Sequence, residues 1–469
     1  MRTGRRILKN LFSLSIAEVA NKGILFLSTI YLARTILPEG FGVISFANSL
    51  LIFFSLAVNL GFNIVGSREI AKDHAKIPLY AGQITSIRLI LAIVAAAALT
   101  FVALIISKPL TTKIVIIISS INLFSQAILM DWVYQGNEKM EFLALRQVVT
   151  SLLSLIGLLL FVKTSNDIIL AMIITVASML INSLWMFALY TKMYGKIKLG
   201  IDKVFMRTLL KSSIPITFST FFILIFNFLN IVMLGFLRSD AETGFYTAAF
   251  KFVVLVLTPS AIIQNAFFPV LSRSVSIEER QKKIQIYGNF IFIIGAIISL
   301  IIMLFPAQVI GLVYGSKYVE SIPLLQILMG TVLVMYLNTI YYPPLVSWKF
   351  EKTVMYAIGT GGIINIILNF LLIPQYGASG AAWSTVFSEL TVLMGLLIIM
   401  KKVIRKIFIL KKLVILSVAV FSVAGGYFLD KFFHINVILN SIFILLIYFV
   451  LILVFKIVSI PELKSYLRK

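Results

Sequence analysis

Apolar runs of about 20 residues recur along the whole chain, and this feature limits the possible folds more than any other. The run LILAIVAAAALTFVALII, which begins at Leu89, is one of them. The chain is 60% hydrophobic and 13% charged, whereas a soluble domain is about half apolar and about a quarter charged. The runs are continuous and lack the alternating pattern of an outer-membrane barrel. The sequence therefore predicts an all-α polytopic membrane protein.

About fourteen transmembrane helices are expected, because each run is long enough to cross the hydrocarbon core of a bilayer. The first run is too long for a secretory signal and lacks a small-residue cleavage site, so we expect it to remain as the first helix. The expected spans cover residues 11–33, 42–65, 83–107, 114–135, 142–162, 168–190, 213–236, 246–271, 287–304, 321–346, 354–373, 380–399, 413–429 and 437–456.

Lysine and arginine are distributed unevenly between the two sides that these spans define. The loops on the side of the N-terminus hold 29 of them, and the opposite loops hold 7. This bias follows the positive-inside rule, and it predicts a protein of the cell (cytoplasmic) membrane with both termini in the cytoplasm. The net charge of +23 thereby has a topological explanation, and no nucleic-acid partner is expected.

Catalytic and metal chemistry finds little support in the sequence. The chain has no cysteine, which excludes thiol catalysis, disulfides and cysteine metal sites. It contains no phosphate-binding loop, metal-ligand cluster or nucleophile triad. The predicted outer loops, of at most about 16 residues, are too short for an extracytoplasmic catalytic domain. We therefore expect a protein that is not an enzyme and that has no cofactor and no metal.

An internal repeat with a spacing of 204 residues indicates how the helices are grouped. The segment PEGFGVISFANSLLIFFSL at Pro38–Leu56 aligns with ETGFYTAAFKFVVLVLT at Glu242–Thr258, and both begin in a short outer turn. Six spans separate the two copies, which implies parallel pseudo-symmetric repeats. We predict a six-helix N-lobe at 1–200, a six-helix C-lobe at 201–400 and a C-terminal helix pair at 401–469. Two such lobes around a cavity would make a transporter.

Polar residues share one face on each of four predicted helices, the first, second, seventh and eighth, when successive residues are placed at about 100°. These helices open the two lobes, so both halves would turn a polar face toward a common space. Polar and charged groups at this depth are costly and are therefore candidates for a functional site. The candidates on these faces are Asn21, Lys22, Asn48, Asn227, Lys251 and Asn265.

Glu18 and Lys22 lie four residues apart on the first helix, in the order that favours an ion pair. Lys22 follows the interfacial Lys9 by 13 residues, or roughly 20 Å, which is too deep for its side chain to reach the interface. The pair either neutralises itself or serves transport, and both interpretations stay open. One hypothesis combines them: Glu18 holds Lys22 while the cavity is empty and releases it when cargo enters.

Four further charged residues are candidates for a functional site. Lys251 has no acidic residue within four positions on its own helix, which favours a functional role. Glu389 is a lone acid midway along the twelfth span, and is either a charge partner for Lys251 or a site for a coupling cation. Arg88 and Arg146 lie near the inner face, as does Asp131; these charges either snorkel or pair, or the two arginines meet an anionic headgroup from the inner leaflet.

Four segments, in order along the chain, resemble recurring segments of the polysaccharide-transport flippases. They are IAEVANKGILFLSTIYLARTILPEGFGVISFANS, GFYTAAFKFVVLVLTPSAIIQNAFFPVLSR, VYGSKYVESIPLLQIL and INIILNFLLIPQYGASGAAWSTVFSE. The superfamily of these flippases also contains the multidrug-and-toxin extruders and the lipid II flippase. The resemblance covers essentially the whole chain.

The resemblance implies a V-shaped pair of six-helix lobes with two extra helices. It also implies a cargo, an oligosaccharide on polyprenyl pyrophosphate, that is turned from the inner to the outer leaflet by alternating access. Members of the family line their cavity with cations, and Lys22 and Lys251 match that pattern by position, although Glu18 and Glu389 balance them. Implied partners are membrane lipid, glycosyltransferases and a polysaccharide polymerase. Lipid II flipping and multidrug cation antiport on the same fold stay open as alternatives.

Overall fold

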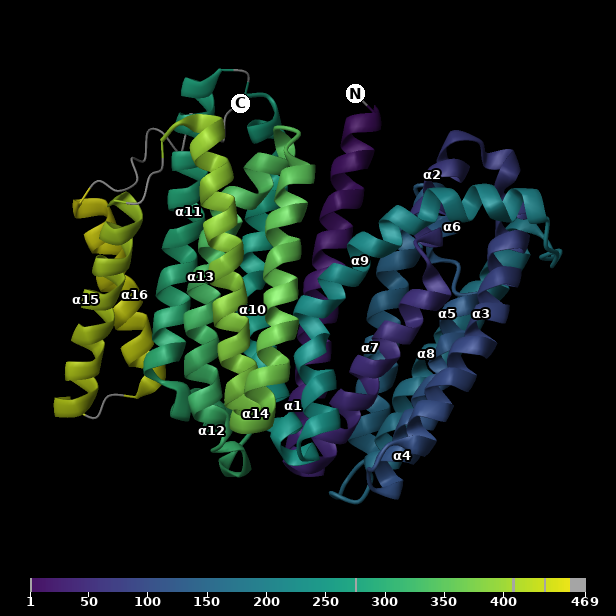
Figure 1. Cartoon of the computed structure of the whole chain (residues 1–469), viewed down its shortest axis with the longest axis horizontal. Coiled ribbons are helices and arrows are strands. Elements are labelled where there is room, and N and C mark those ends of the chain that lie inside the picture. The colour runs from purple at the N-terminus through teal and green to yellow at the C-terminus, as the bar shows by residue number, and fades with distance from the viewer. Residues whose placement is uncertain (1, 275, 407–409, 434–435, 456–469) are drawn as a thin grey trace. The chain divides into compact units, whose positions relative to one another are not determined.

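Helices make up every element that the computed structural model of the chain describes, which covers residues 2–274, 276–406, 410–433 and 436–455 (Figure 1). Within these ranges the side chains of residues 2–19, 410, 433 and 438 lie outside the description. The chain divides into two compact units, Met1–Gly244 and Phe245–Lys469. The predicted lobe limits at residues 200 and 400 stay predictions.

The helices follow one another with short connections. The first unit contains α1 (Arg2–Asn59), α2 (Phe62–Lys72), η1 (His74–Lys76), α3 (Ile77–Ile105), α4 (Leu110–Ser120), α5 (Asn122–Ile128), α6 (Asp131–Gly136), α7 (Met140–Phe161), α8 (Ile168–Tyr194), α9 (Lys203–Leu237) and the start of α10 (Asp240–Ser272). The second contains the rest of α10, α11 (Ile277–Leu304), α12 (Pro306–Val313), η2 (Ser316–Tyr318), α13 (Ser321–Ser347), α14 (Glu351–Ile404), α15 (Leu410–Phe433) and α16 (Val437–Val454).

The prediction of an all-α multi-pass membrane protein is confirmed. Within the described residues, 11 helices are long and apolar enough to cross a membrane. Two of them, Ala20–Lys72 and Glu351–Ile404, extend over 53 and 54 residues, which is enough for two spans each. The shorter apolar helix Leu439–Val454 adds one more. This arrangement is consistent with the fourteen predicted spans.

Two kinks explain why pairs of predicted spans are joined into single long helices. In α1 the backbone of Leu37 is non-helical, with φ 62° and ψ 174°, immediately before Pro38. Proline restricts the residue before it and removes a backbone donor, so the chain turns there without a separate loop. In α14 the break is at Gly377, with φ 55° and ψ −133°, a conformation that glycine adopts readily.

The predicted span 114–135 is interrupted in the structure and consists of α4, α5 and α6. At the end of α4 the hydroxyl groups of Ser119 and Ser120 donate hydrogen bonds to the carbonyl oxygens of Ile116 and Ile117, both at 2.7 Å. Such bonds compete with the helical ladder and weaken it. A hydropathy pattern does not register this competition, because serine is tolerated in apolar helices.

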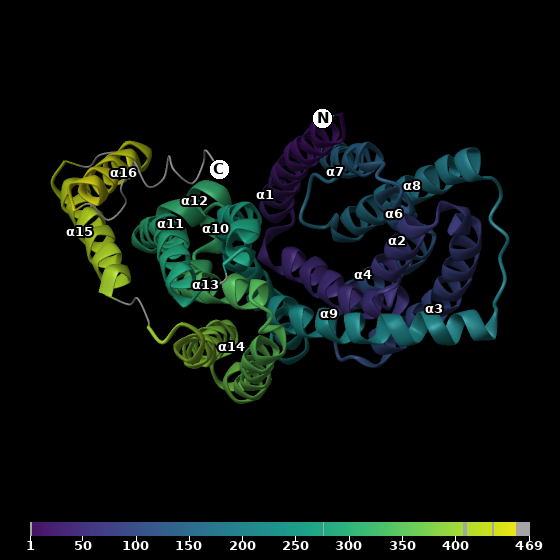
Figure 2. The same cartoon turned by 90° about the horizontal axis from the view of Figure 1, so that it is seen from above.

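Helix α9 crosses the end of the first unit at which α1 and α3 begin, which we call its N-terminal end, and then turns along the unit (Figures 1 and 2). Pro215 lies inside α9 and bends it. Near its start, the rings of Tyr80 on α3 and Phe205 on α9 are in edge contact, with centroids 4.8 Å apart. This contact holds the start of α9 against α3.

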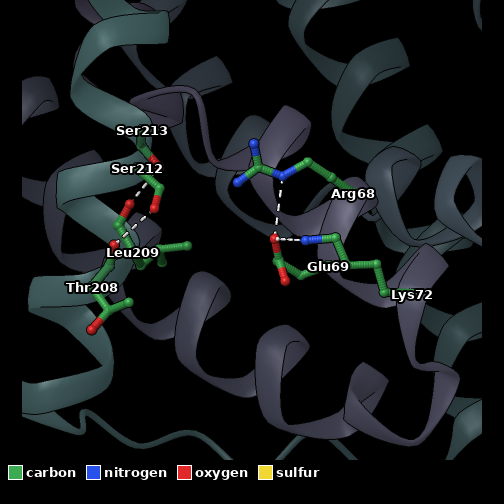
Figure 3. Close-up of polar contacts among 7 residues, drawn as sticks. All are labelled: Arg68, Glu69, Lys72, Thr208, Leu209, Ser212 and Ser213. Atoms are coloured by element: carbon green, nitrogen blue, oxygen red, sulfur yellow. Dashed lines mark hydrogen bonds and ion pairs between the residues drawn. The ribbon is translucent and has the colours of Figure 1, made fainter.

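Helix α2 carries an exposed ion-pair group beside α9 (Figure 3). Oε1 of Glu69 accepts from Lys72 Nζ at 2.8 Å and from Arg68 Nε at 3.2 Å. On α9 the hydroxyl groups of Ser212 and Ser213 donate to carbonyl oxygens one turn earlier, at 3.2 and 2.8 Å, so they add no bond to the charged group. Exposed pairs of this kind contribute little to stability.

The second unit is built on α11, α13 and α14, and α10 is attached to α13. The hydroxyl of Tyr336 donates to the carbonyl of Val256 at 2.6 Å, and the indole of Trp348 donates to that of Leu271 at 3.0 Å. The pair α15 and α16 packs on α11 (Figures 1 and 2). Lys412 of α15, 4% exposed, donates to Asn289 of α11.

The turn before α8 contains a carboxylate whose protonation should affect stability. Oδ2 of Asp167 accepts from the backbone N–H groups of Lys163 and Thr164, at 2.9 and 2.8 Å, and from the hydroxyl of Thr164 at 3.0 Å. These bonds lower the pKa of Asp167 below its ordinary value. Because the folded pKa is depressed, the stabilisation is present above about pH 3.9, the usual pKa of Asp, and is lost as the pH falls through the folded pKa.

We therefore expect Asp167→Asn to reduce the loss of stability between neutral and acidic pH. The measurement is thermal unfolding of both proteins in detergent from pH 7 to pH 3. The Glu278→Gln variant, which neutralises an exposed acid, is a control for a general charge effect. Equal acid sensitivity of wild type and Asp167→Asn would contradict the prediction.

Candidate functional site

Arg88, Arg146 and Asp131 come together in the first unit. Arg146 Nη2 lies 2.9 Å from Asp131 Oδ2, and their side chains are 12% and 24% exposed. Arg88 is 1% exposed, and its Nη2 donates to Asn63 Oδ1 at 2.6 Å. The structure thus encloses Arg88 in the interior, whereas the side chains of Arg146 and Asp131 are partly exposed.

Several buried polar atoms of this cluster lack a hydrogen-bond partner among the described residues. They are Nε of Arg88, Nε of Arg146, Oδ1 of Asp131 and Oδ1 of Asn182. The possible encounter of Arg88 and Arg146 with a headgroup stays a prediction, and Arg146 is the more accessible of the two.

The candidates on α1 are only partly covered by protein. Lys22 is exposed, and Asn21 and Asn48 are half-buried. The side chain of Glu18 lies outside the described residues, so its predicted pairing with Lys22 stays a prediction. Lys22 takes part in an interaction in the structure and is not an isolated charge.

The candidates on α9 and α10 belong to different units. On α9, in the first unit, half-buried Asn227 donates to the carbonyl of Ile223 at 2.8 Å. On α10, in the second unit, Lys251 and Asn265 are exposed. Among the described residues, no carboxylate forms an ion pair with Lys251. An ammonium group on an apolar helix is thereby open to an anionic partner.

Glu389 is enclosed between α13 and α14 of the second unit. It is 8% exposed, and Asn338 Nδ2 donates to its Oε2 at 2.7 Å and to its backbone carbonyl at 3.1 Å. Ser388, the residue directly before Glu389, accepts a hydrogen bond from buried Asn365 at 3.2 Å. Asn338 was not among the residues predicted from the sequence, where its only signal was a polar residue in an apolar span. Asn338 is the partner that the structure gives Glu389, and the coupling role of Glu389 stays a prediction.

A second buried charged group, in the first unit where α3 ends and α4 begins, was also not predicted from the sequence. Lys108 Nζ lies 2.8 Å from Asp240 Oδ1 and donates to the carbonyl of Arg238 at 2.8 Å, and Thr112 donates to Asp240 Oδ2 at 3.0 Å. The side chains of Lys108 and Asp240 are 11% and 6% exposed. We call Lys108, Thr112 and Asp240 the Lys108 joint. Its one sequence signal was a lysine on the outer side, where basic residues are few.

Backbone contacts between two turns surround this joint. A Cβ atom added to Gly42 would lie 1.7 Å from the carbonyl oxygen of Asp240, and one added to Gly244 would lie 2.0 Å from that of Pro38. These two turns are the copies of the internal repeat, and they approach each other as closely as backbone allows. A cavity of about 520 Å³, lined in part by Glu39, Lys108 and Asp240, adjoins them.

Metal chemistry gains no support from side-chain geometry. Within the described ranges, no three His, Cys, Asp or Glu side chains are grouped so that they could hold a metal ion. The enclosed carboxylate of Glu389 is paired with an amide, and Asp131 and Lys108 are paired with opposite charges.

Comparison with known proteins places this fold. Residues 7–275 match the family described as polysaccharide biosynthesis protein. The chain is 26% identical to the "Putative O-antigen transporter" of Shigella dysenteriae, over 83% of this chain and 98% of that protein. It is 24% identical to the protein of the same name from Escherichia coli (strain K12), over 81% of this chain and 93% of that protein.

A solved structure shares the fold. The lipid II flippase MurJ in an inward closed conformation superposes with a TM-score of 0.75, covering 94% of this chain and 98% of that one, at 15% identity. This likeness concerns the fold, because the identity is low. The family match covers more than half of the 469 residues. The chain therefore belongs to the polysaccharide biosynthesis protein family.

Proposed function

We propose that the protein is a flippase that moves oligosaccharide units on polyprenyl pyrophosphate from the inner to the outer leaflet of the cell membrane, for the synthesis of a surface polysaccharide. The observation that carries the proposal is the family match over residues 7–275. The two bacterial relatives named as O-antigen transporters match over nearly their whole length, 98% and 93%, which supports a cargo of this class.

The chemistry of such a cargo requires cations and hydrogen-bond donors inside the membrane. A pyrophosphate carries about two negative charges and cannot enter hydrocarbon without paired charges and bonds. Exposed Lys251 and Lys22 supply the cations in this proposal. The amides of Asn21, Asn48, Asn227 and Asn265 are suited to phosphate oxygens and sugar hydroxyls.

The direction of transport rests on the charge asymmetry of the loops. With 29 basic residues on the side of the N-terminus and 7 opposite, both termini are proposed to be cytoplasmic. Arg146, which is partly exposed, would then meet the headgroup on its way in from the inner leaflet. Glycosyltransferases that build the cargo and a polymerase that consumes it are the proposed partners.

Coupling to an ion gradient is assigned to Glu389, with Glu18 as a second acid. Glu389 is enclosed, and the amide of Asn338 holds one of its carboxylate oxygens. An acid in such a place gains or loses charge only together with a proton or a cation, because an isolated buried charge is strongly disfavoured. Glu389→Gln should therefore remove any response of transport to an imposed pH or sodium gradient.

The proposal is tested with purified protein in vesicles that contain a fluorescent oligosaccharide linked to polyprenyl pyrophosphate. Transport is measured as the fraction of cargo that becomes accessible to a membrane-impermeant glycosidase. We expect this fraction to rise above the half already present in the outer leaflet, and an unchanged fraction would overturn the proposal. Faster transport of lipid II than of the oligosaccharide cargo in the same assay would support the alternative function of a lipid II flippase.

A further inference from the structure

A mainly apolar cavity of about 260 Å³ lies in the first unit, beneath the linker 195–202 that joins α8 to α9. Its walls come from α3, α5, α8 and the linker itself, and its polar lining is limited to Thr85, Thr191 and Lys196. The apolar lining residues are Leu89, Ile128, Phe187, Ile197 and Leu199. Apolar space at the edge of a membrane helix bundle is suited to a hydrocarbon chain.

The linker is held over this cavity by defined contacts with α3. The N–H of Gly200 donates to Ser86 Oγ at 3.0 Å, and the N–H of Asp202 donates to Gln83 Oε1 at 2.9 Å. A Cβ atom added to Gly82 would lie 2.3 Å from the carbonyl oxygen of Lys198, so only glycine permits this approach. The roof of the cavity is therefore a built part of the fold.

The charges around the cavity have one sign. Lys196 lines it, and Lys192 and Lys198 are exposed on the same segment, which contains no acid between residues 191 and 201. The first acid after it, Asp202, caps α9 by accepting from the N–H groups of Val204 and Phe205, at 2.8 and 3.2 Å. Its negative charge is thereby directed at the start of α9.

We propose that this cavity is a binding site for an anionic phospholipid of the inner leaflet. One acyl chain enters the apolar cavity, and the phosphate lies against Lys196, with Lys192 and Lys198 nearby. The location in the inner leaflet rests on the orientation proposed above, but the site itself does not. The bound lipid joins the linker to α3 and so reinforces the attachment of the start of α9 to α3.

The proposal is tested by native mass spectrometry of the full-length protein, in detergent with phosphatidylglycerol or phosphatidylcholine and without oligosaccharide. We expect wild type to retain phosphatidylglycerol preferentially, by about fivefold for each lysine that contributes. The triple variant Lys192→Gln, Lys196→Gln, Lys198→Gln should lose this preference. The matched control removes three exposed lysines of the second unit, by Lys349→Gln, Lys352→Gln and Lys401→Gln, and should keep it.

A cavity-filling variant separates the acyl chain from the headgroup. Thr191→Phe should reduce retention of both lipids, while Thr191→Ser, which keeps the space, should behave as wild type; thermal unfolding shows that each variant is folded. Equal retention of the two lipids by wild type, or an equal loss in the control triple variant, would overturn the proposal. Since the measurement contains no cargo, its outcome is independent of whether the protein is a flippase.

Discussion

Lys108→Ala should lower the free energy of unfolding by about 3–5 kcal/mol, the range measured when one member of a buried ion pair is removed. The partner carboxylate of Asp240 is 6% exposed and would keep a single hydrogen bond from a side chain, that of Thr112. Asp240→Ala should have an effect of similar size, because it leaves the ammonium group of Lys108 unpaired. The measurement is chemical or thermal unfolding in detergent.

Two comparisons test the physical reason. The double variant Lys108→Met, Asp240→Leu removes both charges and should recover much of the loss, since no unpaired charge remains. Arg238→Ala breaks the nearby pair with Glu242, whose side chains are each 32% exposed, and should change stability by about 1 kcal/mol or less. If the free energy of unfolding of Lys108→Ala differs from that of wild type by no more than the change expected for Arg238→Ala, the Lys108 joint does not stabilise the fold.

Lys251→Ala should reduce the initial rate of cargo transport by at least about thirtyfold, because bound cargo would desolvate the pair of Lys251 and pyrophosphate, and loss of one partner of such a pair costs roughly 2–5 kcal/mol. Lys251 is exposed on α10, and no carboxylate of the described chain neutralises it. In the proposed mechanism this charge binds the pyrophosphate of the cargo. Lys251→Arg keeps the charge and should retain most of the activity.

The matched control for Lys251 is Lys317→Ala, which removes an exposed lysine in the short helix η2 and should transport as wild type does. Both variants are first compared by thermal unfolding, so that a lost rate is not mistaken for a lost fold. Normal transport by Lys251→Ala would remove this residue from the proposed mechanism. In a cell, the expected loss of transport by Lys251→Ala should appear as accumulation of lipid-linked units at the inner face.

The all-α, multi-pass character of the chain was predictable because hydrophobic length is a local property of the sequence. The two joined helices show the limit of that reasoning. Pro38 indicated a turn, but the sequence did not show that Leu37 alone would take up the conformational change. Likewise, the break after Ser120 depends on the carbonyl group to which the serine hydroxyl donates its hydrogen bond, and the sequence does not specify that group.

The candidate site was predictable in part. Arg88, Arg146 and Asp131 were recognised as charges near one face, and pairing was among the alternatives; the structure shows that the pair is Arg146 with Asp131. The enclosure of Arg88 was not, because exposure depends on how α2 and α3 pack. The partners of Glu389 and Lys108 are 51 and 132 residues away in the chain, a separation that no helical periodicity covers.

The sequence by itself determined that this chain is a helical membrane protein of the polysaccharide biosynthesis family, since continuous apolar runs and family segments are properties of the residues in order. Only the tertiary structure decided which polar groups meet. Asn338 reaches Glu389, Lys108 reaches Asp240, and Gly82 admits the linker over an apolar cavity. The physical reason is that apolar helices can pack in many ways with similar burial, and the few buried polar groups are satisfied in only some of them.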